Sequence, residues 1–312
     1  MTDAVQAFVS AVVYVRNDEA GIYGFLKWLG PALEERFFQV EVVCVDDASA
    51  DGSADEIRRA AAELPGVTLT IIHMGYHHGR EAAMRAGDDL AIGDYVFEFD
   101  RAVPEFPLSA LDEAFKTMME GYDIVGVAPR GRRRFTSKLF YKVINHSAGV
   151  ANDLDTETFR ILSRRALNRI QSTSQAFPYR KALYANSGLP QATVSYEICD
   201  GGGRSEKRDA EDGRYRLRIA VDALVLFTQT GYKVALGFSF FMMAVALFMI
   251  VYSFVSYFAG ITVSGWMTTV LFMAFAFFGL FGILAIVLKY LQIIVDLVFK
   301  KKAYIFEGIE RN

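Results

Sequence analysis

Residues 40–53 run VEVVCVDDASADGS, and this stretch decides the fold class. Val40–Val45 is a short, mostly apolar and β-branched run, which is typical of a buried strand. Asp46 and Asp47 follow directly, and the chain then turns into an Ala-rich segment that predicts a helix. In parallel α/β sheets, ligands bind at the carboxyl ends of the strands. The stretch therefore predicts a strand–turn–helix unit that presents two carboxylates at a binding edge.

The same alternation of strand and helix continues on both sides of this unit. We expect strands at Phe8–Val15, Val67–His73, Tyr95–Phe99 and Asp123–Val127, and helices at Ala20–Leu33, Ala54–Leu64, Arg80–Leu90 and Ser109–Gly121. Gln191–Ile198 is a further candidate strand. Repeated β-α-β units predict an α/β domain with a mainly parallel sheet that is covered on both faces.

The composition limits the class of protein. Of the 312 residues, 53% are hydrophobic and 22% are charged, which excludes intrinsic disorder. The net charge of −3 gives no general attraction to nucleic acid. The two cysteines are too few for a disulfide framework, so we expect the domain to face a reducing compartment.

One block of the chain is almost uniformly apolar. From Val234 to Leu288, 55 residues contain no Asp, Glu, Lys, Arg or His. A buried hairpin of a soluble protein has no reason to exclude every charged residue over this length. The block predicts two membrane spans, about 234–258 and 266–288, joined by a short turn at Ala259–Gly265. Lysines lie only outside the pair of spans, so the positive-inside rule predicts a multi-pass inner-membrane protein whose domain and both termini are cytoplasmic.

These features predict four regions: an α/β domain at 1–213, an amphipathic helix at 214–232, a transmembrane hairpin at 233–299 and a cytoplasmic tail at 300–312. The helix at 214–232 is either a core helix or an interfacial helix, and we favour the interfacial one because it directly precedes the apolar block.

Asp46 and Asp47 are the strongest candidates for chemistry. Ser49–Ser53 alone is also compatible with a simple helix cap, in which Asp51 or Ser53 accepts hydrogen bonds from free helix N–H groups. Two adjacent carboxylates at a strand end are harder to explain structurally, because they repel each other unless they hold polar groups. We therefore expect them to bind a ligand.

Here the sequence resembles the family 2 glycosyltransferases, and in particular the branch that makes polyprenyl-phosphate sugars. The similar segments are Val13–Glu19 (VYVRNDE), Val45–Gly52 (VDDASADG), His77–Ala83 (HHGREAA) with Gly87, Phe159–Arg165 (FRILSRR), Arg214–Leu217 (RYRL) and Lys302–Glu307 (KAYIFE). No single motif decides the resemblance, but their order and the apolar hairpin make it specific.

The resemblance implies a GT-A fold, a UDP- or GDP-linked sugar donor and a polyprenyl (undecaprenyl) phosphate acceptor. On this basis we expect the nucleotide sugar to contact Val15, Asn17, Asp18, Asp46, Asp47, Arg80 and Asp100. We expect the acceptor phosphate to contact Arg130, Arg132, Arg133 and Arg160, because guanidinium groups bind phosphate in a bidentate manner. The arginines of 130–134 alternatively attract anionic lipid headgroups.

One segment departs from the family pattern. The family has D-A-D-L-Q-D-P-P after its fourth strand and holds a divalent metal there, whereas this chain has Asp100-Arg101-Ala102-Val103-Pro104-Glu105-Phe106-Pro107. If Mg²⁺ or Mn²⁺ is used, Asp100 and Glu105 are its candidate ligands. The alternative is that Arg101 supplies the positive charge instead, so we name Asp100, Arg101 and Arg160 as candidate catalytic residues. His77 and His78 are adjacent and lack metal-ligand spacing, which favours a loop role.

The sequence thus predicts a membrane-anchored inverting glycosyltransferase of cell-envelope glycan synthesis that transfers sugar to a polyprenyl phosphate. Two alternatives remain open. One is a transferase that acts on another lipid-linked glycan, and the other is a degenerate, non-catalytic partner subunit that binds nucleotide or lipid. The sequence leaves open whether the chain forms a homo-oligomer.

Overall fold

The computed structural model describes residues 5–130, 157–173, 180–185, 187–197, 266–299 and 304–312, with isolated residues between 237 and 248. The chain divides into two compact units, residues 1–219 with 302–312, and residues 220–301. The predicted interfacial helix at 214–232, residues Arg132–Arg134 and nearly all of the first predicted span lie outside the described residues.

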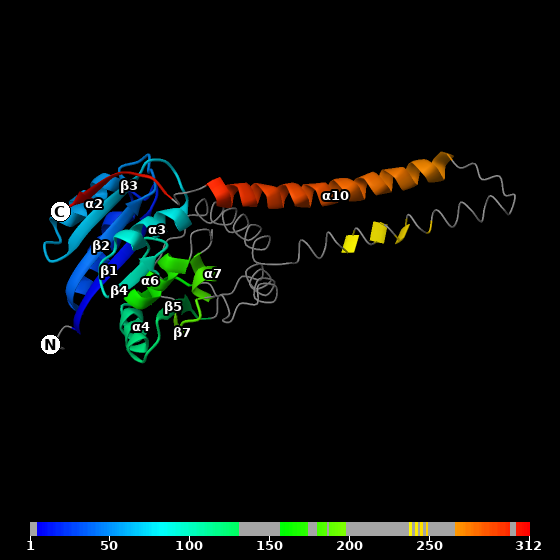
Figure 1. Cartoon of the computed structure of the whole chain (residues 1–312). Helices are drawn as coiled ribbons and strands as arrows, with labels where there is room; N and C mark the ends of the chain where they lie inside the picture. Colours follow the sequence, from blue (N-terminus) through cyan, green and yellow to red (C-terminus); the bar gives the residue numbers. More distant parts are fainter. Residues whose placement is uncertain are drawn as a thin grey trace. The chain divides into compact units, whose positions relative to one another are not determined.

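The first unit alternates strands and helices, as the sequence predicts (Figure 1). The strands are β1 (Val5–Val15), β2 (Phe37–Asp46), β3 (Thr68–Met74), β4 (Tyr95–Phe99), β5 (Ile124–Pro129), β6 (Phe159–Ser163), β7 (Gln191–Tyr196) and β8 (Phe306–Arg311). The helices are α1 (Ile22–Glu34), α2 (Ser53–Ala62), α3 (Arg80–Leu90), α4 (Ser109–Met119), α6 (Arg164–Thr173) and α7 (Arg180–Ala185).

The strands form one sheet in the order β7-β5-β6-β4-β1-β2-β3-β8. Its centre is parallel, because β1 pairs with β2 and β4, and β2 pairs with β3. The carboxyl ends of β1, β2, β3 and β4 therefore lie at one edge, where the sequence predicts the binding site.

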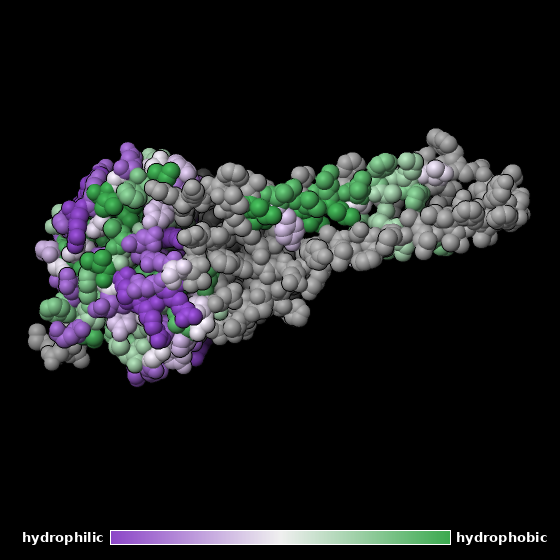
Figure 2. Space-filling view, viewed as in Figure 1, coloured by the Kyte–Doolittle hydropathy of each residue, from purple (hydrophilic) through white to green (hydrophobic). Residues whose placement is uncertain are grey.

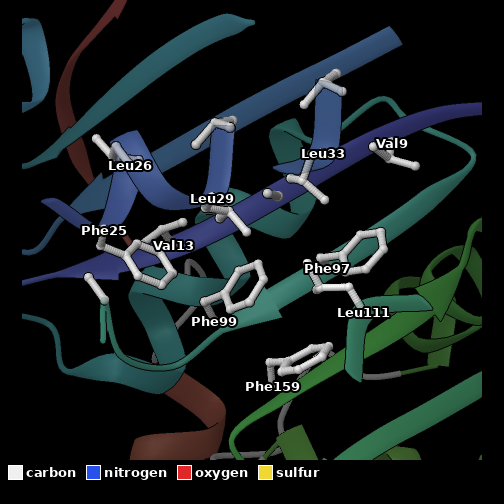
Figure 3. Packing of buried hydrophobic residues seen from close by; sticks show 14 of the residues in the cluster. Val9, Val13, Phe25, Leu26, Leu29, Leu33, Phe97, Phe99, Leu111 and Phe159 are labelled. Carbon is white, nitrogen blue, oxygen red and sulfur yellow. The ribbon is translucent and has the colours of Figure 1, made fainter. Parts of the chain in front are cut away.

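Apolar side chains fill both faces of the sheet. On one face, Val9, Val13, Phe97 and Phe99 from β1 and β4 pack against α1, α2 and α4 (Figure 3). On the other face, Val12 and other buried strand residues pack against α3, α6 and α7. The alternation along β1 explains both cores, because successive side chains of a strand point to opposite faces.

Gly87 sets how closely α3 approaches the sheet. A Cβ atom at Gly87 would lie 2.3 Å from Cγ1 of Val12 and 2.8 Å from Cγ2 of Val45. Any side chain there would push α3 away from β1 and β2, so glycine fixes the helix and its first residue, Arg80, against the strand ends.

Two strands of the sheet were not predicted from the sequence. β6 inserts between β4 and β5 and runs antiparallel to both. β8 comes from the segment predicted as a cytoplasmic tail, and it pairs antiparallel with β3 at the sheet edge. Both strands are short, and the segments next to them in the chain carry no β-α-β pattern, so the periodicity did not indicate them.

In the second unit, α10 (Trp266–Phe299) is a helix of 34 residues. Large apolar side chains on it are exposed, including Phe278 at 72%, and Figure 2 shows hydrophobic residues along most of the helix. Counting only residues that the structure describes, no helix has the length and apolar character needed to cross a membrane. The predicted spans, of which 266–288 lies within α10, remain predictions.

We predict that Glu310→Gln lowers the stability of the first unit at neutral pH by up to about 1 kcal/mol, the usual upper limit for a surface ion pair. Glu310 accepts two hydrogen bonds of 2.8 Å from the Arg58 guanidinium, which lowers the pKa of Glu310 to about 2. Because this pKa is below the unfolded value of about 4.3, the contribution is present above that value and is lost as the pH falls toward 2.

Denaturation of wild type and Glu310→Gln across this pH range tests the prediction. The difference in stability should be largest near pH 7 and should shrink as the solution is acidified. A difference that grows with acidification would contradict it.

Candidate functional site

Hydrogen bonds join the loops that follow β1 and β2. The Asn17 side chain accepts a hydrogen bond of 2.8 Å from the Ala50 N–H, and the Asn17 N–H donates to Oγ of Ser49 at 3.0 Å. The Asp18 N–H donates to Oγ of Ser53 at 2.8 Å. Asn17 has a positive φ of 47°, a conformation that asparagine tolerates better than most residues.

Residues 49–53 thus have mainly a structural role, which the sequence left open. Their hydrogen bonds fix the loop after β1. Asp51 also accepts hydrogen bonds from both the N–H and the hydroxyl of Ser53 at the start of α2. Asp46 is buried, and its carboxylate accepts from the Ser49 N–H at 3.0 Å and lies 3.4 Å from Nδ1 of His73.

The Asp47 side chain is fully buried and accepts four hydrogen bonds from the protein itself. The donors are the Tyr14 hydroxyl at 3.0 Å, Nδ1 of His77 at 2.8 Å, the His78 N–H at 2.8 Å and the Gly79 N–H at 3.0 Å. The sequence predicts that Asp47 binds the nucleotide directly. The geometry instead supports a positioning role, because both carboxylate oxygens are already occupied by the loop that leads into α3.

Tyr14 and Arg80 lie next to this carboxylate. Burial and the neighbouring Asp47 raise the pKa of the Tyr14 hydroxyl, so it stays protonated and donates to Asp47. The Arg80 guanidinium lies 5.5 Å from the centre of the Tyr14 ring. Arg80 is the first residue of α3, where the helix dipole also favours an anion.

A second group of charged residues surrounds Asp100 at the end of β4. The Arg180 guanidinium donates to Asp100 at 2.5 Å and to Glu98 at 2.7 Å. The Arg160 guanidinium donates to Glu98 at 2.6 Å and to Glu157 at 2.6 Å. The group contains two guanidinium ions and three carboxylates, so most of its charge is balanced internally.

The members of this cluster shift one another's pKa values. The cluster consists of Glu98, Asp100, Glu157, Arg160 and Arg180. Burial alone would raise the pKa of Asp100, but Arg180 and Arg160 outweigh burial and hold it below its usual range. The carboxylates in turn raise the pKa values of Arg160 and Arg180, against the effect of burial. The cluster therefore remains ionised at neutral pH.

The residues at Asp100 do not fit a divalent metal as the structure arranges them. One Asp100 oxygen is bonded to Arg180, the other lies 4.0 Å from Arg160, and Glu105 pairs with Arg101 at 3.7 Å. In the described part of the chain, no three His, Cys, Asp or Glu side chains form a group that could hold an ion. Asp100 is thus paired with Arg180, and Glu105 with Arg101. The Asp100–Glu105 metal site and the role of Arg101 at the donor diphosphate remain predictions.

The predicted acceptor residues lie in different environments. Arg160 is only 2% exposed and its guanidinium is bonded to carboxylates, so its geometry favours a structural role over phosphate binding. Arg130 is exposed at the end of β5, and its N–H donates to the Tyr196 carbonyl at 2.7 Å. Arg132 and Arg133 lie outside the described residues.

Arg180, Glu98 and Glu157 were not predicted as site residues. Arg180 follows a segment with no recognisable motif, and Glu98 interrupts an otherwise apolar strand, Tyr95–Phe99. A charged residue in the middle of a buried strand is the one signal that the sequence offered, because such a residue needs a partner.

A family model described as Glycosyl transferase family 2 matches residues 10–171, which is more than half of the chain. The chain belongs to glycosyltransferase family 2. The family 2 match includes β1–β6 and the loops described above. The expected GT-A fold, an α/β arrangement with a mainly parallel sheet, is thereby confirmed.

Several proteins are similar to this family 2 chain. An uncharacterized glycosyltransferase of Synechocystis is 27% identical over 195 residues, which is 61% of this chain and 60% of the relative. The undecaprenyl-phosphate 4-deoxy-4-formamido-L-arabinose transferase of Aeromonas hydrophila is 34% identical over 147 residues, 46% of this chain and 44% of the relative. The chain thus spans less than two thirds of the length of both.

One similar solved structure is a mannosyltransferase from Pyrobaculum calidifontis in complex with GDP-Man and Mn²⁺. It superimposes with a TM-score of 0.49 at 16% identity, covering 89% of this chain and 87% of that chain.

We predict that Asp47→Ala destabilises the protein by about 1–3 kcal/mol, because it leaves buried donors without an acceptor. Tyr14→Phe removes one of those donors and should cost about 1 kcal/mol. Tyr23→Phe is the matched control, since its hydroxyl bonds Glu63 at the exposed surface. Denaturation curves measure all three, and equal effects of Tyr14→Phe and Tyr23→Phe would contradict the prediction.

We also predict that nucleotide binding is unchanged by a chelator. Arg180 already neutralises Asp100, so no ligand set is left for a divalent ion. Calorimetry with UDP and with GDP, in Mn²⁺ and in EDTA, makes the comparison. Loss of binding in EDTA would mean that Arg180 leaves Asp100 when metal and nucleotide arrive. Arg101→Ala tests the alternative role of Arg101. Because Arg101 pairs with Glu105 and not with Asp100, we expect nucleotide binding by this variant to remain insensitive to EDTA.

Proposed function

We propose that the chain is a membrane-anchored, inverting glycosyltransferase that moves a sugar from a UDP- or GDP-linked donor to undecaprenyl phosphate. The observation that carries the proposal is the set of loops organised by Asp47 at the carboxyl edge of a family 2 sheet. Relatives named as undecaprenyl-phosphate sugar transferases, 32–34% identical to this chain, support the acceptor.

The chemistry makes modest demands on the protein. A phosphate oxygen of the acceptor is already an anion, so it attacks the sugar without a strong general base. The leaving diphosphate develops negative charge, and fixed positive groups stabilise it. Arg80 at the N-terminus of α3 is the residue that we assign to this role. Positioning of donor and acceptor contributes the rest.

The membrane anchor is the second part of the proposal. The described residues of α10 expose large apolar side chains such as Phe277, Phe278 and Leu280, which are costly to leave in water. Residues 266–288 of this helix contain no charged side chain. An anchor of this kind would hold the domain beside an acceptor that is itself a membrane lipid.

A donor screen tests the activity directly. The purified full chain in micelles that contain undecaprenyl phosphate is incubated with UDP- and GDP-linked sugars, and lipid products are detected by mass spectrometry. We expect one donor to give a glycosylated lipid phosphate. Arg80→Gln should weaken binding of the matching nucleotide, whereas Arg59→Gln, an exposed arginine on α2, should not.

The anchor predicts a topology that labelling can check. In a Cys199→Ser background, cysteine at position 264 should react with an impermeant reagent in intact cells, and cysteine at position 205 should not. Cys44 is buried and should remain unlabelled. Reaction at position 205 alone would show that the domain faces outward.

A second candidate function is a partner subunit that binds nucleotide without catalysis. The observation in its favour is that Arg180 and Arg160 neutralise Asp100, where the family pattern has a metal site. Nucleotide binding without turnover of any donor in the screen would favour this function.

A further inference from the structure

The segment that precedes β8 contacts the loop between β3 and α3. The Gly75 N–H donates to the Ile305 carbonyl at 3.1 Å, and the Ile305 N–H donates to Nε2 of His78 at 3.0 Å. The Tyr304 hydroxyl donates to Asp89 on α3 at 2.7 Å. Two residues ahead of β8 are therefore bonded to the loop, to His78 and to α3.

The His78 ring is held in one tautomer by these contacts. Its Nδ1 lies 2.5 Å from the Tyr76 carbonyl, which can only accept, so Nδ1 carries the proton. Its Nε2 faces the Ile305 N–H, which can only donate, so Nε2 is unprotonated. The ring also stacks on Tyr76, with centroids 3.8 Å apart. Both ring nitrogens are thus used to connect Ile305 to the loop.

The backbone of the same residue belongs to the Asp47 network. The His78 N–H and the Gly79 N–H donate to the buried Asp47 carboxylate. Gly79 has a φ of 90°, which favours glycine, and the next residue is Arg80. The backbone conformation of His78–Gly79 therefore determines the position of the first turn of α3 and of the Arg80 guanidinium.

We propose that His78 is a positioning residue, through which the segment Tyr304–Ile305 holds the His77–Gly79 loop ready for the donor diphosphate. The proposal rests on the proposed function in that Arg80 meets the diphosphate. Asp47 fixes this loop from the interior of the domain, and Ile305 fixes it from the surface. Without the contact to Ile305, the half-buried ring of His78 no longer fixes the loop, which then samples several conformations that nucleotide binding has to order again.

The far end of β8 has separate contacts, which allows the two ends to be tested independently. The Asn312 side chain accepts a hydrogen bond of 2.7 Å from the Leu69 N–H, and Glu310 pairs with Arg58. These contacts hold β8 on β3 and do not touch the His77–Gly79 loop. If His78 served only to hold β8 on β3, its substitution would therefore have the same effects as the substitution of Asn312.

Three variants of the full chain in micelles separate positioning from simple stability. His78→Phe keeps a flat ring for stacking but removes both the acceptor for Ile305 and the donor to the Tyr76 carbonyl. His78→Gln offers a side-chain oxygen as an acceptor for Ile305 and an N–H as a donor. Asn312→Ala removes one bond at the other end of β8. Hydrogen exchange of residues 76–79 is measured without nucleotide, together with melting temperature and the affinity for UDP and GDP.

We expect His78→Phe to speed exchange of the loop amides and to weaken nucleotide affinity by about tenfold, because the bonds of the ring to Ile305 and Tyr76 are both lost. His78→Gln should restore most of both, and Asn312→Ala should lower the melting temperature without changing either. Unchanged loop exchange in His78→Phe, or equal changes in His78→Phe and Asn312→Ala, would overturn the proposal. If wild type binds neither nucleotide, the proposed function fails, and loop exchange still decides the role of His78.

Discussion

The buried carboxylate of Asp47 is the interaction on which the rest of the site depends. An anion without exposed surface is tolerated only when donors surround it, and four protein groups do so here. These donors come from β1 and from the loop after β3, so the side chain of Asp47, the residue that follows β2, connects the segments on both sides of that strand end. The entry into α3, and with it Arg80, follows from that arrangement.

In the cluster around Asp100, buried carboxylates are stabilised by guanidinium ions. Removal of one member would leave its partners buried and uncompensated, which is far more costly than the net stability that the cluster provides. Arg180 consequently has little freedom to move unless a ligand replaces its bonds to Glu98 and Asp100.

The sequence predicted the central strands and the binding edge because both depend on local periodicity. Val40–Val45 and Asp46–Asp47 carry their signal within a few residues, and the structure confirms the strand and the position of both carboxylates at its end. The sequence could not assign Asp47 an internal role, since its donors lie 30 to 33 residues away in the chain. β8 was missed for the same reason, because its partner β3 is separated from it by more than 200 residues.

The pairing of β8 with β3 has a consequence for biosynthesis. Until residues 306–311 have been translated, β3 is an open sheet edge whose backbone groups can pair with another chain. Residues 220–301, which contain the apolar block, are translated in the interval, so the edge stays open while they are made. A nascent chain that stalls within this block therefore exposes an aggregation-prone edge.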